Sequence, residues 1–201
     1  GRHPRSGFFD GAIDPQRETK ISVFPPWKNG GYAVVDVPEA VFSNLGLTYL
    51  AHTHIHTVWT NAGVELPRLE WQEQDDGSWL SRRELPNGIV LATHVEAAAD
   101  EVRMELTLHN GTKQKLTGLR VQNCVMLKAA TGFTAQSNYN KMLRPPYAAV
   151  HSDDGKRWII TAWSPLHRTW ANPTCPCIHS DPQFADCEPG KTVRMQGRLW
   201  F

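Results

Sequence analysis

Three histidines at alternate positions form the clearest chemical pattern in this chain. They are His52, His54 and His56, within the segment GLTYLAHTHIHTVW at residues 46–59. Successive side chains of a strand point to opposite faces, so residues two apart share a face at a spacing of about 6.5–7 Å. The other face of this predicted strand is mainly apolar. Imidazoles arranged in this way suit a metal-binding or acid–base site on a β scaffold.

A further histidine extends the candidate metal site. His94 lies in a predicted strand at residues 88–96, on the same face as Glu96. We expect His52 and His54 to hold one transition-metal ion together with His94 or His56. Histidine ligands suit Zn, Cu or Fe.

The second unusual segment is residues 163–190, which read WSPLHRTWANPTCPCIHSDPQFADCEPG. It is too long and too rich in proline for one helix or strand, and its Trp, His and Cys content argues against disorder. We expect an ordered lid loop over one end of the domain. It would supply ring-stacking and hydrogen-bonding groups from Trp163, Arg168, Trp170 and Asp181. If no metal binds, a histidine of the histidine face, such as His54, would act as general base and His167 or His179 of the lid as acid.

Three of the four cysteines lie in this lid, and their spacing allows two interpretations. Cys175, Cys177, His179 and Cys187 could form a zinc site, but the C-x-C-x-H order is not a common zinc-finger spacing. The favoured interpretation is a disulfide from Cys187 to Cys175 or Cys177, because those two are too close in sequence to bond each other. Cys124, in a predicted strand, is expected to be a packed free thiol.

Strands joined by tight turns must position these groups. The chain has 15 Gly, 14 Pro and 8 Trp, and few segments of helix-forming composition. Residues 101–109 alternate regularly, with Val102, Met104, Leu106 and Leu108 on one side. We predict an all-β fold, a single β-sandwich of supersandwich or jelly-roll type at residues 21–201, preceded by an N-terminal arm at residues 1–20.

One stretch resembles a known superfamily. The sequence MELTLHNGTKQKLTGLRVQNCVML, residues 104–127, is similar to the central hairpin of galactose-mutarotase-like β-supersandwich proteins. The resemblance implies a carbohydrate ligand on a concave sheet. It also implies a lyase or epimerase using histidine acid–base chemistry. The catalytic histidine of the epimerases is replaced here by Gln122, Asn123 and Cys124.

A second resemblance is to the cupins, whose first metal motif is a glycine followed after five residues by H-x-H. Gly46, His52 and His54 fit that spacing, and Pro86-x-Gly88 followed by His94 resembles half of the second motif. The cupin glutamate has no counterpart in residues 55–60. This resemblance also implies a β-sandwich, with metal at His52, His54 and His94.

Composition limits the choice of partner. Lys plus Arg number 21 and Asp plus Glu 20, so the net charge of +1 gives no electrostatic basis for binding nucleic acid or an anionic membrane. No apolar run approaches the roughly 20 residues that span a bilayer. Loop aromatics such as Trp59, and the polar Asn138, could contact a sugar.

We therefore expect a carbohydrate-active protein, an enzyme in which the metal polarises a sugar oxygen or activates bound water or an oxygen species. The alternatives are a metal-free lyase or epimerase and a non-catalytic carbohydrate-binding module. Because cysteines in such a loop oxidise readily outside the cytoplasm, we expect an extracytoplasmic or secreted protein. The chain ends in an apparent strand, so we expect a longer precursor. The oligomeric state is left open.

Overall fold

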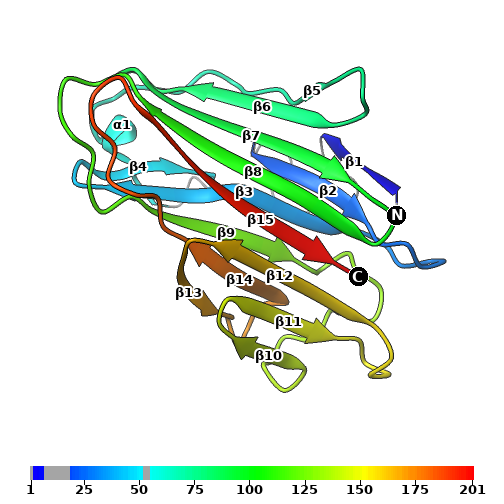
Figure 1. The fold of residues 1–201 in the computed structure, drawn as a ribbon. Coiled ribbons are helices and arrows are strands. Elements are labelled where there is room, and N and C mark those ends of the chain that lie inside the picture. The colour runs from blue at the N-terminus through cyan, green and yellow to red at the C-terminus, as the bar shows by residue number, and fades with distance from the viewer. Residues whose placement is uncertain (1, 7–18, 52–54) are drawn as a thin grey trace.

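Two antiparallel sheets packed face to face make up the molecule in this computed structural model (Figure 1). The structure describes residues 2–6, 19–51 and 55–201. The only helix in these ranges is the short α1 (Val58–Asn61). No helix there is long and apolar enough to cross a membrane. The predicted all-β sandwich is confirmed.

The first sheet has seven strands in the order β1-β2-β3-β9-β14-β13, with β4 also paired to β3. Their bounds are β1 Arg2–Ser6, β2 Lys20–Phe24, β3 Ala33–Ser43, β4 Gly46–Leu50, β9 Arg120–Met126, β13 Leu166–Trp170 and β14 Cys177–Pro182. Strand β9 therefore lies between partners that are far from it in the sequence.

The second sheet has eight strands in the order β10-β11-β12-β15-β8-β7-β6-β5. Their bounds are β5 Gln72–Glu73, β6 Trp79–Glu84, β7 Ile89–Ala97, β8 Glu101–Asn110, β10 Lys141–Arg144, β11 Tyr147–His151, β12 Trp158–Ser164 and β15 Thr192–Trp200. Strand β8 pairs along its length with β7 and β15.

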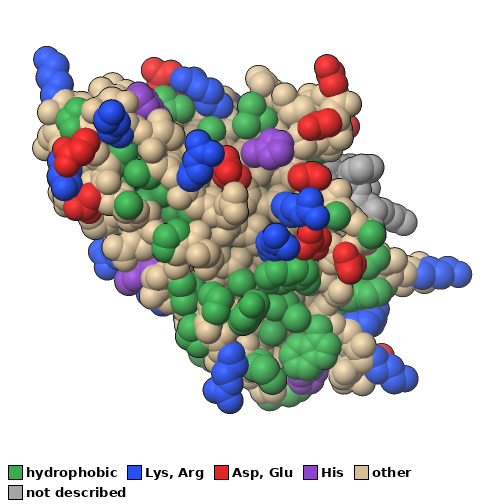
Figure 2. All heavy atoms as spheres, viewed as in Figure 1, with side chains coloured by type: hydrophobic (Ala, Val, Ile, Leu, Met, Phe, Trp, Pro, Cys, Tyr) green, Lys and Arg blue, Asp and Glu red, His purple; other side chains and the backbone are tan. Residues whose placement is uncertain are grey.

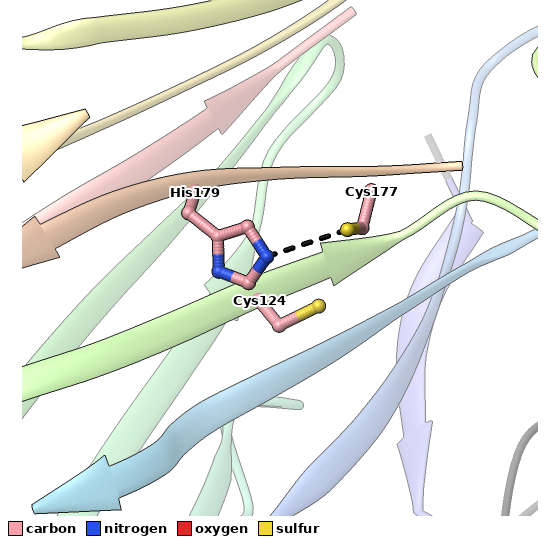
Figure 3. A group of neighbouring side chains, drawn as sticks. All are labelled: Cys124, Cys177 and His179. Atoms are coloured by element: carbon pink, nitrogen blue, oxygen red, sulfur yellow. Dashed lines mark hydrogen bonds between the residues drawn. The ribbon is translucent and has the colours of Figure 1, made fainter. Parts of the chain in front are cut away.

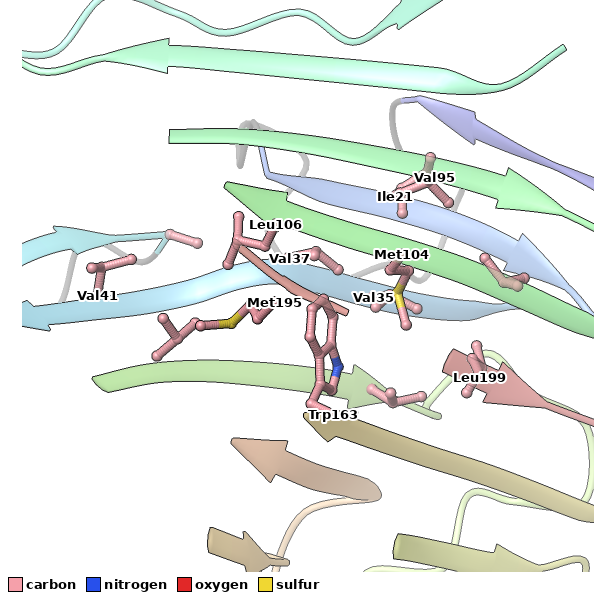
Figure 4. Close-up of a cluster of buried hydrophobic side chains, with 14 of the residues drawn as sticks. Ile21, Val35, Val37, Val41, Val95, Met104, Leu106, Trp163, Met195 and Leu199 are labelled. Atoms are coloured by element: carbon pink, nitrogen blue, oxygen red, sulfur yellow. The ribbon is translucent and has the colours of Figure 1, made fainter. Parts of the chain in front are cut away.

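The core fills the space between the sheets, because alternate residues of each strand point inward. The predicted alternation of residues 101–109 is confirmed: Val102, Met104, Leu106 and Leu108 are all buried. Figure 4 shows side chains from both sheets meeting around the indole of Trp163, which is 2% exposed.

Two predicted elements are corrected. The predicted histidine strand ends at Leu50 in β4, and α1 begins at Val58. The hydroxyl of Thr57 accepts the N–H of Thr60, and Thr60 bonds back to the N–H of Thr57, so this pair caps the helix. The predicted lid loop at residues 163–190 instead holds β13 and β14, which form the edge of the first sheet.

Candidate functional site

Polar side chains gather on the outer face of the first sheet, where β9 and β14 lie side by side. On β14, Ile178 belongs to the core, so the residues on either side of it, Cys177 and His179, point to the opposite face. On β9, the core residue Val125 leaves Cys124 on that same outer face. We call the face formed by Gln122, Cys124, Cys177, His179 and Asp181 the polar face.

Asp181 organises one half of the polar face. Its Oδ1 accepts the backbone N–H of Asn123 at 3.1 Å, and its Oδ2 accepts Arg168 Nε at 2.9 Å and Trp170 Nε1 at 2.6 Å. The carboxyl group is 1% exposed. Burial raises its pKa, against the opposing effect of His179, Arg168 and Trp170. Both oxygens already accept hydrogen bonds, so Asp181 positions its neighbours.

His179 is held by a stacked ring on one face and by contacts at both ring nitrogens. Trp170 stacks on it with 3.9 Å between ring centroids and 15° between ring planes. Its Nδ1 lies 2.9 Å from the carbonyl oxygen of Asn123, and its Nε2 lies 3.4 Å from Cys177 Sγ. Trp170 in turn carries the Arg168 guanidinium 5.1 Å above its ring. The orientation of the imidazole is therefore fixed.

Cys177 is a buried thiol with an unusual charge environment. Hydrogen bonds from the Cys124 thiol and the His179 imidazole outweigh burial and lower the pKa of Cys177 to about 4. Donation to Cys177, together with burial, raises the pKa of Cys124 well above its ordinary value. Burial opposes charge on His179, but its interactions with Cys177, Glu39 and Asp181 raise its pKa. The Cys177 sulfur and the His179 Nε2 are joined by a hydrogen bond of 3.4 Å between two buried side chains (Figure 3).

Two carboxylates of β3 border the same group. The register between β3 and β9 shifts between Asp36 and Ala40. Such an irregularity re-aims side chains, and carboxylate oxygens of Asp36 and Glu39 lie within 4.8 Å of Cys124 Sγ and of each other. Lys20 Nζ bonds both oxygens of Asp36 at 2.7 Å in a buried ion pair. Glu39 accepts the Gln122 amide at 2.6 Å.

A pocket of about 150 Å³ opens beside this cluster. Its lining is mainly polar and comes from β3, β9, β13 and β14, namely Phe42, Arg120, Val121, Gln122, His167, Arg168 and Asp181. Arg168 is half exposed, and its Nη2 lies 3.4 Å from the Gln122 side-chain oxygen. The pocket therefore offers two guanidinium groups, an imidazole and an amide to a small polar ligand.

The structure brings together five of the predicted site residues, and all five come from the supposed lid: His167, Arg168, Trp170, His179 and Asp181. They meet because β13 and β14 form a hairpin on the edge of the sheet.

The other predicted site residues lie elsewhere in the fold or outside the described residues. His52 and His54 are outside the described residues, so the predicted metal site there stays a prediction. His56 is exposed before α1, and His94 Nε2 bonds Ser78 Oγ at 2.8 Å on the outer face of the second sheet. The indole of Trp59 donates a hydrogen bond to the carbonyl oxygen of Thr48. Asn138 is exposed in the segment before β10, and Trp163 is buried in the core.

The predicted disulfide is not present. All four cysteines are free thiols. Cys177 pairs with Met126 at one end of β9, whereas Cys187 forms an isolated bridge with Leu116, which precedes the other end. Cys187 Sγ instead bonds the carbonyl of Lys191 at 3.2 Å. This separation also removes Cys187 from the four-residue zinc set considered above. Cys124 is buried and free, as predicted.

Sequence reasoning missed Glu39, Arg120, Gln122 and the role of Cys124. One signal was present: Arg120, Gln122 and Cys124 alternate along β9 with residues that include the apolar Val121 and Val125. On a strand with a buried inner face, such a row marks a polar outer face. Nothing in the sequence indicated that β3 and β14 would flank it.

A second depression, of about 670 Å³, lies on the outer face of the second sheet and is mainly apolar. It is lined by Met142, Arg144, Tyr147, Ala149, Trp158, Ile160 and Trp200. Figure 2 shows hydrophobic side chains gathered over this part of the molecule. Tyr147 and Met142 are about half exposed, at 49% and 50%. We call this surface the aromatic face.

Comparison with known proteins adds information on the fold. No family model matches the chain, and no curated protein matches it in sequence. A solved structure described as a kojibiose phosphorylase from the human microbiome superposes with a TM-score of 0.53 at 4% identity. The match covers 92% of this chain and 29% of the other. The likeness shows a shared β fold, and this chain spans less than a third of that protein.

Proposed function

We propose that this chain is a carbohydrate-binding β-sandwich of a carbohydrate-active protein, and that the pocket beside Asp181 holds the sugar. The supporting observation is that Arg120, Gln122, His167 and Arg168 line one small pocket. The buried carboxylate of Asp181 accepts a hydrogen bond from Arg168 and so orients it. The structural likeness to a protein described as a disaccharide phosphorylase agrees with this proposal.

The size and chemistry of the pocket indicate what it would hold. Pockets for drug-sized ligands measure about 300–1,000 Å³, so a volume of about 150 Å³ suits one sugar residue or a chain end. Amide and guanidinium groups donate hydrogen bonds to hydroxyl and carboxylate oxygens. Arg120 contacts the Phe42 ring at 5.8 Å. Two arginines favour a sugar that carries a carboxylate over a neutral one.

The arrangement favours binding over acid–base catalysis by the carboxylate. A general base must accept a proton from the substrate, but both oxygens of Asp181 already accept hydrogen bonds from the protein. Asp181 instead pre-orients Arg168 and Trp170. Pre-orientation of this kind lowers the entropy that a ligand must lose on binding.

The aromatic face supports a second candidate, a carbohydrate-binding module that stacks sugar rings on Tyr147, Trp158 and Trp200. Exposed aromatic patches of this kind mark interaction sites. The rings are positioned by neighbouring strands, with 6.1 Å between the centroids of Tyr147 and Trp200. The two candidates place the ligand on opposite outer faces of the sandwich.

Binding to an array of neutral and uronate-containing oligosaccharides, followed by calorimetry, tests both candidates. We expect Arg120→Ala to weaken uronate binding at least tenfold, since a hydrogen bond to a charged group is worth about 1.5–3 kcal/mol. Arg194→Ala, at an exposed arginine on β15, is the matched control and should bind as the parent does.

The outcomes separate the two faces. Loss of binding in Tyr147→Ala with unchanged binding in Arg120→Ala would show that the ligand binds at the aromatic face. If neither variant differs from the parent and no oligosaccharide binds, the carbohydrate proposal fails.

A further inference from the structure

We propose that Cys124, Cys177 and His179 form a binding site for one zinc ion, which clamps β9 to β14. Its ligands are not those of the predicted histidine site, and the inference does not depend on sugar binding. Its three ligand atoms, two sulfurs and an imidazole nitrogen, lie within 4.8 Å of one another and point toward a common centre (Figure 3).

The distances suit a tetrahedral ion. Zinc bonds of about 2.3 Å to sulfur and 2.0–2.1 Å to nitrogen place adjacent S and N ligands about 3.5 Å apart. The separation between His179 Nε2 and Cys177 Sγ is 3.4 Å. Binding therefore needs loss of protons from these groups and little movement of Cys177 or His179.

The environment of His179 supports the assignment independently. Metal-binding histidines usually donate the N–H that is not used for the metal to a carbonyl or carboxylate, which fixes the ring and the tautomer. The Nδ1 of His179 lies 2.9 Å from the carbonyl of Asn123, which leaves Nε2 facing the two sulfurs. Trp170 stacked on the ring further restricts its rotation.

The ligand types select the ion. Two thiolates and one imidazole favour zinc over magnesium or calcium, which prefer oxygen ligands. Two thiolates with Zn²⁺ make a neutral group, which suits a site where all three side chains are at most 3% exposed. A water molecule completes the tetrahedral coordination.

The strand register argues against the simplest alternative, a disulfide between the same two cysteines. Cys177 pairs with Met126, so Cys124 is its diagonal neighbour two residues along β9. Diagonal neighbours are about 7–8 Å apart, beyond the Cα separation of about 4.4–6.8 Å that a disulfide allows. A metal ion bridges this longer gap.

X-ray absorption spectroscopy of the zinc-loaded, reduced parent protein tests the proposal without any substitution. We expect one zinc per chain, with at least two sulfur ligands at about 2.3 Å and one or two nitrogen or oxygen ligands at about 2.0–2.1 Å. Zinc bound through nitrogen and oxygen alone would place it on the other histidines and overturn the proposal. So would the absence of zinc after loading.

Cobalt substitution with matched variants gives a second readout. We expect Co²⁺ to produce thiolate charge-transfer bands in the parent and in Cys187→Ser, which removes a buried cysteine outside the cluster. Cys124→Ser and Cys177→Ser should each weaken Co²⁺ binding by at least tenfold, and Mg²⁺ should not compete. Unchanged bands in Cys177→Ser would contradict the site, and circular dichroism of each variant shows whether it is folded.

Discussion

At the scale of single residues, the position of the Trp163 indole depends on a glycine, Gly197, whose lack of a side chain leaves room for the ring. The indole lies across Gly197 of β15, which is directly opposite Trp163 in the ladder. A Cβ built on Gly197 would approach the Trp163 ring to 2.2 Å. Real contacts of that length do not occur, so this glycine is required by packing.

We predict that Gly197→Ala lowers the free energy of unfolding by about 1–3 kcal/mol, the usual cost of overpacking a core. Urea denaturation measures it. In a Trp163→Leu background the added cost should fall close to zero, because the clashing ring is gone. Gln196→Ala, an exposed neighbour, should stay within about 0.5 kcal/mol of the parent. An equal cost of Gly197→Ala in both backgrounds would show that the ring is not the cause.

At the scale of elements, the sequence predicts strands well where one face is apolar and the other is not. Strand β8 is such a case, and the β11–β12 hairpin closes at the turn residues Asp153-Asp154-Gly155. Strand β14 reads CIHSDP, and all six of its residues are buried. Its polar side chains find partners within the protein: His179 and Asp181 bond to β9 and β13, and Ser180 bonds to Trp163 of β12 and to the Pro146 carbonyl. The period-2 hydrophobic pattern is therefore missing, and residues 163–190 looked like a loop.

The candidate site was predictable only in part, because its residues come from strands that are distant in sequence. The residue types in the segment at residues 163–190, among them Arg168, Trp170, His179 and Asp181, did indicate a site. Their partners Glu39, Gln122 and Cys124 come from strands 40 to 140 residues away in sequence, and only the sheet order brings them together. The alternation of His52, His54 and His56 suggested a continuing strand, but the capped helix after Thr57 ends that pattern.

A carboxylate that links two strands gives a pH-dependent prediction. Glu101 of β8 accepts Arg103 Nε at 2.6 Å and Arg198 Nη1 of β15 at 3.3 Å. The hydrogen bond from Arg103 is the main cause that lowers the pKa of Glu101 below 4.5, and the charges of both arginines add to it. A depressed pKa stabilises the folded state above pH 4.5, and this stabilisation is lost as the pH falls through the folded value.

We expect Glu101→Gln to be less stable than the parent by about 0.5 kcal/mol at pH 7, because the arginines are half exposed to solvent. At a second pH, chosen below the folded pKa of Glu101, the difference should narrow, since Glu101 is then protonated in both states. Urea denaturation at the two pH values measures this. Glu65→Gln, at an exposed position outside the sheets, controls for the loss of a carboxylate. A constant difference at both pH values would argue against an ionic origin.

At the scale of the whole molecule, the topology places sequence-distant strands in the middle of each sheet. Strand β9 lies between β3 and β14, and β15 joins β8 to β12. The sequence could predict neither arrangement, because pairing between distant strands leaves no local signal. The polar face and the aromatic face then lie on the two outer surfaces, so ligand binding to one can be separated from the other by mutation.

This arrangement predicts a pattern of hydrogen exchange along the chain. Amides in central strands exchange only through larger openings, whereas edge strands open locally. We expect the slowest exchange in β8, β9 and β15 and fast exchange in the edge strands β5, β10 and β13, measured by mass spectrometry of peptides from the reduced protein. The comparison of β9 with β13 is the sharpest, since both belong to the first sheet but only β9 is paired on both sides. If β9 exchanges as fast as β13, its pairing with β3 and β14 is not stable in solution, and the clustering of Cys124 with Cys177 and His179 would fall with it.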